Sequence, residues 1–305
     1  MGTGMKCAQP TRRQFIQRTA QITATTLAAP VLLGAADAKA DYQIGCFTRP
    51  WAAFDWRIAF DEIAAAGFKH VGLMTTNSPS KHILSQETTV DQAHKVGEEA
   101  RQRGLGIPSA WGGDLNIATS TDGGVGTLRH MIDLCAAAGC RSILLGGVGN
   151  AKFAGPYYEA IARCADEAAA KNVMLTIKPH GGTNGTGAQL RDAVKKVGNR
   201  NFRIFYDAGN IYYYSDGKIS PVEDAPSVSG FVSGWCIKDF TMKPKKDVDI
   251  TPGTGQVDFK SVLGELRKGG FVSGALVVET LSPGDRGHLQ AEAKKALKFV
   301  EDLVA

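Results

Sequence analysis

From residue 42 onward, short apolar runs alternate with longer stretches whose apolar residues recur at helical spacing. A short apolar run bounded by polar residues or glycine predicts a buried strand, whereas apolar side chains three and four residues apart predict one face of a helix. The first pair is "YQIGCF" (42–47) and "WRIAFDEIAAAGF" (56–68), in which Gly67 marks the end of the helix. Seven more strands are predicted at 70–75, 106–113, 141–148, 173–182, 202–211, 232–240 and 274–281.

The alternation predicts the class of fold. Eight strands separated by helices over residues 41–305 match a (β/α)8 barrel in number and in length. No low-complexity linker interrupts the pattern, so we expect an α/β protein with a single TIM barrel domain. A doubly wound parallel sheet is the competing architecture, because it uses the same alternation. The further helices are predicted at 89–105, 125–139, 157–172, 188–198, 258–270 and 288–304, with irregular chain after the sixth strand.

Residues 1–40 follow a different pattern. "TRRQFIQRTA" (11–20) places an arginine pair before a phenylalanine, an apolar stretch (22–34) follows, and "ADAKA" (36–40) offers small residues for cleavage. This order resembles a twin-arginine export signal, which implies that residues 1–40 are removed and that the mature chain works in a bacterial periplasm without a stable membrane anchor. The alternative is a basic amphipathic helix at the start of a cytosolic enzyme.

Charge and composition limit the binding partners and cofactors that we expect. The formal net charge is +5, but residues 1–40 hold five basic side chains against one acidic side chain, so the rest of the chain is nearly neutral and nucleic acid is not an expected partner. The glycine-rich "LLGGVGN" (144–150) lacks the Lys and Ser or Thr of a phosphate-binding loop, so no nucleotide cofactor is expected.

Polar residues gather where the strands end, which is where the active site of a TIM barrel lies. In "LTIKPHGG" (175–182) the fifth strand changes within a few residues from apolar side chains to Lys178 and His180. Aromatic rings at strand ends suit the apolar faces of a sugar. The residues predicted to bind substrate are Trp51, Trp111, Asn210, Lys238 and Asp239, and those predicted to act chemically are Lys178, His180, Asp207 and Glu279.

Structural interpretations of the same residues remain open. Glu279 could form a structural ion pair with Lys178, and Lys238 could pair with Asp239 at the rim. Cys236 suits a small packed position better than a ligand position.

Five short motifs resemble those of the sugar phosphate isomerase/epimerase-like, or xylose isomerase-like, TIM barrels. The resemblance extends from Tyr42 to the C-terminus and implies the same fold and a carbohydrate substrate. The motifs are "IKPHGG" (177–182) for "LEPHGG", "YDAGNI" (206–211) for "xDxGN", "CIKD" (236–239) for "HxKD", "TPGTGQVDF" (251–259) for "PGxGxVDF", and "VVE" (277–279) at the end of strand eight.

The resemblance also implies a metal site, from which this chain departs. In the family, Glu, Asp, His and Glu from strands five to eight commonly bind one divalent metal, which polarises sugar oxygens while the two glutamates move protons. Asp207 and Glu279 match two of these ligands. Lys178 stands where the first Glu is expected and Cys236 where the His is expected.

Three accounts of the site follow from this departure. In the first, a rearranged set of His180, Asp207 and Glu279, with Asp239 nearby, retains a divalent metal such as Mg²⁺ or Mn²⁺. In the second, the Lys178 ammonium replaces the metal between the two carboxylates. In the third, Lys178 loses its proton and acts as a base or forms an imine.

The sequence therefore predicts an exported sugar isomerase/epimerase-like enzyme that abstracts a proton next to a carbonyl of a carbohydrate or keto-sugar. Glu279 is the predicted general base, Asp207 the electrostatic anchor, Lys178 or a metal the electrophile, and His180 an acid or a ligand. The alternatives are a lyase or hydratase acting on 3-keto-glycosides, and a non-catalytic carbohydrate-binding barrel that has lost its metal site.

Overall fold

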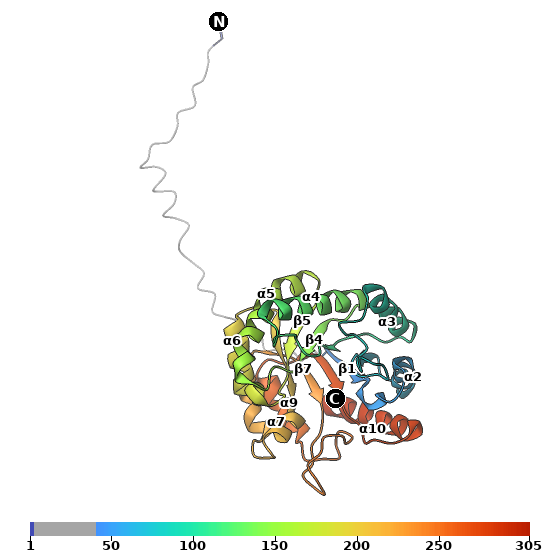
Figure 1. The fold of residues 1–305 in the computed structure, drawn as a ribbon. Coiled ribbons are helices and arrows are strands. Elements are labelled where there is room, and N and C mark those ends of the chain that lie inside the picture. Colours follow the sequence, from blue (N-terminus) through green and yellow to red (C-terminus); the bar gives the residue numbers. More distant parts are fainter. Residues whose placement is uncertain (3–40) are drawn as a thin grey trace. The chain divides into compact units, whose positions relative to one another are not determined.

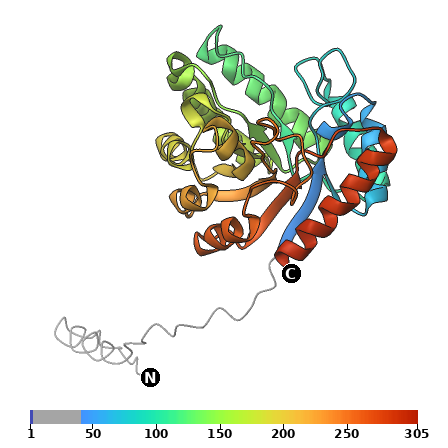
Figure 2. The same cartoon turned by 90° about the horizontal axis from the view of Figure 1, so that it is seen from below.

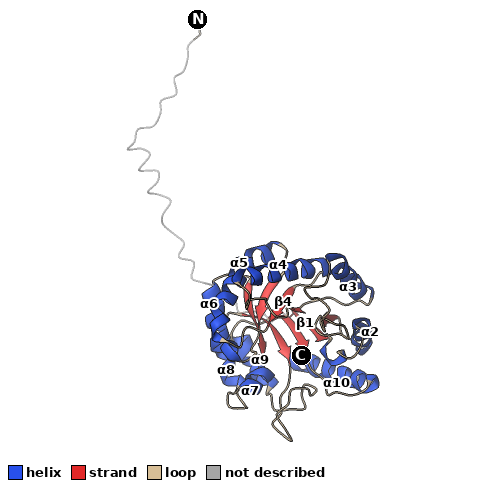
Figure 3. Cartoon of the chain, in the orientation of Figure 1, coloured by secondary structure: helices blue, strands red, loops and turns tan. Residues whose placement is uncertain are grey.

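Helices surround a ring of parallel strands in residues 41–305 (Figures 1 and 3). The computed structural model describes residues 1–2 and 41–305, so the predicted export signal lies outside the described residues. The strands are β1 (Asp41–Phe47), β2 (His70–Gly72), β3 (Ala110–Trp111), β4 (Ser142–Leu145), β5 (Met174–Ile177), β6 (Phe202–Asp207), β7 (Val232–Ile237) and β8 (Ser273–Val278). The helices are α2 (Trp56–Ala66), α3 (Val90–Gln102), α4 (Thr121–Ala138), α5 (Ala154–Ala170), α6 (Gly187–Val197), α7 (Ala208–Tyr214), α8 (Pro221–Asp224), α9 (Phe259–Lys268) and α10 (Arg286–Val304).

The strands close into a barrel. Neighbours pair in the order β2-β1-β8-β7-β6-β5-β4-β3. The two ends of this order are joined by parallel bridges from His70 to Gly106 and from Leu73 to Ala110. The structure thus confirms the predicted TIM barrel, and a doubly wound sheet, whose edges stay open, is excluded. β1 and the last helix, α10, lie side by side, so the first and last elements of the barrel are neighbours (Figure 2).

Two predicted elements differ from the structure. The strand predicted at 106–113 is reduced to Ala110–Trp111, since Pro108 has no N–H to donate to a ladder. The strand predicted at 202–211 ends at Asp207, where α7 begins in place of irregular chain. The Asp207 carboxylate causes this early end, because it accepts the N–H of Asn210 at 2.9 Å and so caps the helix.

The inward-facing positions of the strands determine which side chains reach the site. A small hydrophobic cluster, which includes Phe205, Cys236 and Val277, fills the barrel separately from the larger hydrophobic cluster formed with the helices. Side chains alternate along a strand, so the residue two places after an inward one also faces inward. This rule directs three polar side chains toward the barrel mouth: Asp207, Lys238 and Glu279.

Candidate active site

Four charged side chains meet at the carboxyl ends of β5 to β8, and we call them the charged ring: Lys178, Asp207, Lys238 and Glu279. The Lys178 Nζ lies 3.4 Å from an Asp207 oxygen and 2.5 Å from a Glu279 oxygen. The Lys238 Nζ lies 3.2 Å from Asp207 and 2.7 Å from Glu279. Each ammonium therefore bridges both carboxylates, and the charges alternate around a closed circuit.

The charged ring is almost fully removed from solvent. Its members are exposed by 1, 0, 2 and 2% in chain order. Burial alone would lower the pKa of Lys178, but the carboxylates of Glu279 and Asp207 reverse this effect and raise it above its ordinary value. The side chain is therefore an ammonium, which can neither abstract a proton nor form an imine, so the third account of Lys178 does not fit the structure.

The two carboxyl groups are shifted in opposite directions. Burial raises the pKa of Asp207, and the two lysines only partly oppose this effect. Burial would also raise the pKa of Glu279, but Lys178, Lys238 and Arg49 together hold it well below its ordinary value. Glu279 is thus ionised in the resting site.

Arg49 is a site residue that the sequence analysis missed. It lies in a short 3-10 helix, η1 (Arg49–Trp51), which directly follows β1. Its guanidinium donates to Glu279 at 3.1 Å and to Asp249 at 2.8 Å, and its side chain is 32% exposed. Arg49 therefore links the buried ring to the surface. Its position after the first strand, in "CFTRPW" (46–51), was the available signal.

His180 and Trp111 lie at the mouth, beside the charged ring. The His180 ring is 5.7 Å from the Trp111 ring and 5.4 Å from the Tyr214 ring, measured between centroids. The Lys178 Nζ lies 5.6 Å from the Trp111 centroid. Partial burial of the imidazole, reinforced by the charges of Lys178 and Lys238, lowers the pKa of His180 to about 4, so the ring is neutral at neutral pH.

Asn210 contacts two members of the charged ring and positions them. Its side-chain amide donates to the Pro179 carbonyl at 2.6 Å, and its side-chain oxygen accepts from Lys238 at 3.2 Å. Its backbone N–H donates to Asp207 at 2.9 Å. Asn210 is a predicted substrate-binding residue, but in the structure it is buried and holds Asp207 and Lys238 in place.

Two predicted substrate-binding residues lie outside the site. Trp51 is fully buried in the large hydrophobic cluster, where no substrate can stack on it. Asp239 is also fully buried, and it points away from its neighbour Lys238. Its carboxylate fastens a loop by accepting the backbone N–H groups of Phe240, Gly253, Gly255 and Val257 at 2.7–3.1 Å. The structural alternative, in which Lys238 pairs with Asp239 at the rim, is therefore not what the structure shows, since Lys238 pairs with Asp207 and Glu279.

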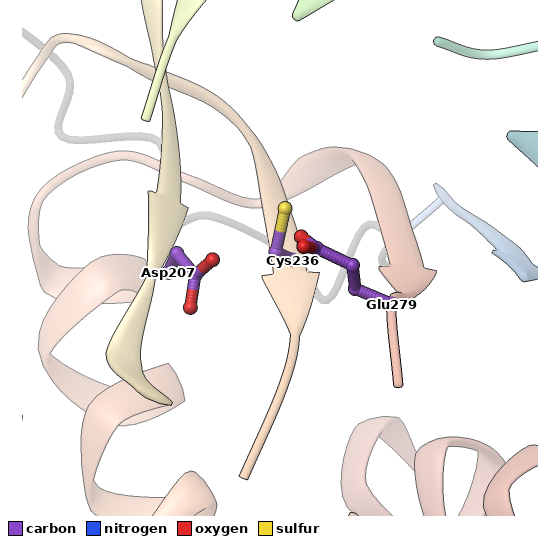
Figure 4. Close-up of side chains that lie close together, drawn as sticks. All are labelled: Asp207, Cys236 and Glu279. Carbon is purple, nitrogen blue, oxygen red and sulfur yellow. The ribbon is translucent and has the colours of Figure 1, made fainter. Parts of the chain in front are cut away.

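The donor set does not fit a divalent metal. Ligand atoms of Asp207, Cys236 and Glu279 lie within 4.8 Å of one another, and Cys236 lies between the two acidic side chains (Figure 4). However, both carboxylates are already bonded to two ammonium groups, and a dication would be repelled by both lysines. Burial raises the pKa of the Cys236 thiol well above its ordinary value, and a neutral thiol is a poor ligand for Mg²⁺ or Mn²⁺.

The rearranged ligand set of the first account is not assembled either. Among the described residues, the group that could surround one ion includes neither His180 nor Asp239. His180 lies at the mouth between two aromatic rings, and Asp239 is used by backbone N–H groups. The arrangement has the geometry of the second account, with an ammonium between the carboxylates, and Lys238 adds a second ammonium that was not anticipated.

The chain matches a known protein family in sequence and several solved structures in fold. Residues 60–303 match the profile of the xylose isomerase-like TIM barrel. A xylose isomerase domain protein from Planctomyces limnophilus superposes with a TM-score of 0.65 at 17% identity, over 86% of this chain and 97% of the other. A D-psicose 3-epimerase solved in the presence of D-fructose gives 0.69 at 16% identity, over 86% and 99%. A xylose isomerase-like TIM barrel protein from Mycobacterium smegmatis in complex with magnesium gives 0.68 at 13% identity, over 87% and 98%.

At such low identities the likeness shows a shared fold. No curated protein matches the sequence. None of the helices in residues 41–305 has the length and hydropathy needed to cross a membrane.

Proposed function

The chain belongs to the xylose isomerase-like TIM barrel family, and from this premise we propose that it is a sugar isomerase/epimerase-like enzyme that moves a proton next to a carbonyl of a carbohydrate. The observation that carries the proposal is the charged ring, in which two ammonium groups and a carboxylate that is ionised in the resting site meet at the mouth of the barrel. The family and the sugar epimerases among proteins of this fold support carbohydrate as the substrate class.

The proposed reaction begins with removal of a proton from the carbon beside the carbonyl. Glu279 takes this proton, the electron pair of the C–H bond forms a C=C bond, and the carbonyl π electrons move to oxygen. The Lys178 ammonium stabilises the resulting oxyanion by donating a hydrogen bond to it. Delivery of a proton from solvent to the opposite face of the same carbon gives an epimer, and Glu279 then releases the proton it took to solvent. Return of the proton from Glu279 to the former carbonyl carbon, after the hydroxyl proton has moved between the two oxygens, gives an isomer.

Substrate binding would make Glu279 a stronger base. In the resting site its low pKa makes it a weak one. A substrate oxygen that accepts the third hydrogen of Lys178 shares the positive charge of the ammonium with Glu279, most strongly as the oxyanion forms. This sharing weakens the ion pair and raises the proton affinity of Glu279. At the mouth of the barrel, Trp111 offers an aromatic face to the substrate, and the neutral His180 beside it offers a hydrogen-bonding group.

Solvent exchange tests the proposal. The protein is incubated in D₂O with a panel of ketoses and 3-keto-glycosides, and deuterium at carbon is followed by mass spectrometry and proton NMR. We expect incorporation with the wild type, a loss of at least about a hundredfold in Glu279→Gln, and no change in Glu301→Gln, a control on the exposed face of α10. Unchanged exchange in Glu279→Gln would show that another group is the base.

The same experiment separates the alternative functions. A dehydrated or cleaved product from a 3-keto-glycoside would assign a lyase, because elimination begins with the same proton abstraction. Binding of sugars without exchange in any of them would favour a non-catalytic carbohydrate-binding barrel, in which the charged ring is purely structural.

We also propose that residues 1–40 direct export to the periplasm by the twin-arginine route, on the sequence pattern alone. The test is cell fractionation of the full chain and of a variant in which Arg12 and Arg13 are both changed to Lys. Wild-type protein in the periplasm, shortened at the N-terminus, together with retention of the variant in the cytoplasm, is the expected result. Equal distribution of the two proteins would reject this route.

A further inference from the structure

We infer that the charged ring takes the place of a divalent cation, and that within it Lys178 is the residue that contacts the substrate while Lys238 is a positioning residue. The inference rests on the proposed function for the identity of the ligand, a carbohydrate oxygen. The part of the inference that concerns metal binding does not depend on any enzymatic activity of the protein.

All four carboxylate oxygens of the ring are already bonded. One Asp207 oxygen accepts from the Asn210 N–H, and the other faces both lysines. One Glu279 oxygen accepts from Arg49 and faces Lys238, and the other accepts from Lys178. A metal ion could gain a carboxylate ligand only by displacing one of these donors. The surrounding residues therefore exclude a metal ion from the site.

The two lysines differ in the number of oxygens around the ammonium, which has three hydrogens to donate. Lys238 donates a hydrogen bond to the Asn210 side-chain oxygen and forms ion pairs with Asp207 and Glu279 at 3.2 and 2.7 Å, so three protein oxygens surround it. Lys178 uses two of its hydrogens, on Asp207 and Glu279.

The third hydrogen of Lys178 is available to a ligand. Among the described residues, Lys178 has no third oxygen partner, and its Nζ lies over the face of Trp111, 5.6 Å from the ring centroid. Trp111 also contacts His180 at the barrel mouth, so this side of the ammonium faces the entrance. A sugar oxygen that enters beside Trp111 would therefore meet Lys178 and not Lys238.

Metal titration tests the first half of the inference. After dialysis against a chelator, the wild type is titrated with Mn²⁺ and free Mn²⁺ is followed by electron paramagnetic resonance. Bound metal in protein as purified is measured by mass spectrometry. We expect substoichiometric metal and no saturable binding. One equivalent of tightly bound divalent metal in the wild type would overturn the inference, whether or not the protein is active.

A converted site provides the positive arm. The double variant Lys178→Glu/Cys236→His places Glu, Asp, His and Glu at the four strand ends, and we expect its Mn²⁺ affinity to exceed that of the wild type at least about tenfold. Cys236→His alone is the matched control, because it leaves the ring intact, and it should bind no Mn²⁺. If the folded double variant does not gain affinity, Lys178 does not occupy the ligand position. If the double variant does not fold, the wild-type titration still decides.

Sugar binding and exchange test the second half. Lys178→Gln should lose both sugar-dependent deuterium exchange and most sugar affinity, and chelator should leave wild-type exchange unchanged. Lys238→Gln should mainly lower the rate of exchange and keep sugar affinity within about threefold, the signature of a positioning residue. The opposite pattern would exchange the two roles. Absence of exchange with every sugar would reject the proposed function and leave the metal result standing.

Discussion

At the scale of single residues, Lys238 shows how much the fold depends on the charged ring. Its ammonium is bonded inside the barrel to Asp207, Glu279 and Asn210. Removing one partner of a buried ion pair costs about 3–5 kcal/mol, because the opposite charge stays buried without compensation. We therefore expect Lys238→Met to lower the free energy of unfolding by about 3–5 kcal/mol in urea denaturation.

Lys298 is the matched control for this prediction. It pairs with Asp302 on α10, but its side chain is 76% exposed, and such surface pairs contribute less than about 1 kcal/mol. Lys298→Met should therefore be nearly as stable as the wild type. A similarly small effect in Lys238→Met would mean that the ring is open in solution.

His180 carries a prediction about pH. Its pKa in the folded protein is about 4, below the ordinary value of 6.5, so between these values the unfolded chain binds this proton more readily than the folded chain. The contribution of His180 to stability is therefore present above about pH 6.5 and is lost as the pH falls toward about 4. NMR titration of the imidazole should give the low pKa directly. His180→Gln should reduce the loss of stability over this interval, and an imidazole that titrates near 6.5 would contradict the assignment.

Alternation along the strands explains which site residues could be predicted. Asp207 and Glu279 end strands whose preceding inward residues are apolar, so their convergence followed from the pattern. The same rule, applied from Cys236, directs Lys238 inward and Asp239 outward. The pairing of Lys178 with both carboxylates was one of three accounts that the sequence left open. The same pairing of Lys238 was beyond prediction, because a long flexible side chain finds its partners only in the assembled barrel.

At the scale of elements, α7 is tightly joined to the end of β7, and this contact was invisible in the sequence. Asp207 ends β6, caps α7 and belongs to the charged ring. Gly209, in the first turn of α7, lies against the backbone of β7's continuation. A Cβ at this position would meet the carbonyl oxygens of Lys238 and Asp239 at 2.7 and 2.8 Å. The motif "YDAGN" therefore has a packing requirement at its glycine in addition to its carboxylate.

Gly209→Ala tests this contact. Because backbone atoms cannot move aside as a flexible side chain can, we expect a loss of about 1–3 kcal/mol in the free energy of unfolding, together with lower exchange activity as Lys238 shifts. Gly264→Ala, in α9, is the matched control, since nothing lies within 4 Å of its added Cβ. Replacing a compatible helical glycine should stabilise the protein by about 0.4–1 kcal/mol. Equal effects of the two changes would show that α7 does not pack closely on β7.

At the scale of the whole molecule, closure of the barrel depends on its first strand. β1 pairs with β2 from Gly45 to Phe47 and with β8 from Asp41 to Cys46, so it joins the beginning of the sheet to its end. The family match begins only at residue 60 and therefore omits this strand. The alternation of apolar runs had already placed a strand at 42–47, because periodicity reports local burial and does not require similarity to a relative.

Two N-terminal truncations separate the barrel from what precedes it. A chain that begins at Asp41 keeps every strand and the whole charged ring, so its free energy of unfolding should lie within about 0.5 kcal/mol of the full chain and its exchange activity should be unchanged. A chain that begins at Trp56 lacks β1 and Arg49, which leaves β2 and β8 with unpaired edges and Glu279 without its third cation. We expect it to lose cooperative unfolding in urea and to expose hydrophobic surface to a fluorescent dye. Cooperative unfolding of the chain that begins at Trp56 would mean that the barrel does not need β1 to close. Marked destabilisation of the chain that begins at Asp41 would show that residues 1–40 contribute to the folded domain.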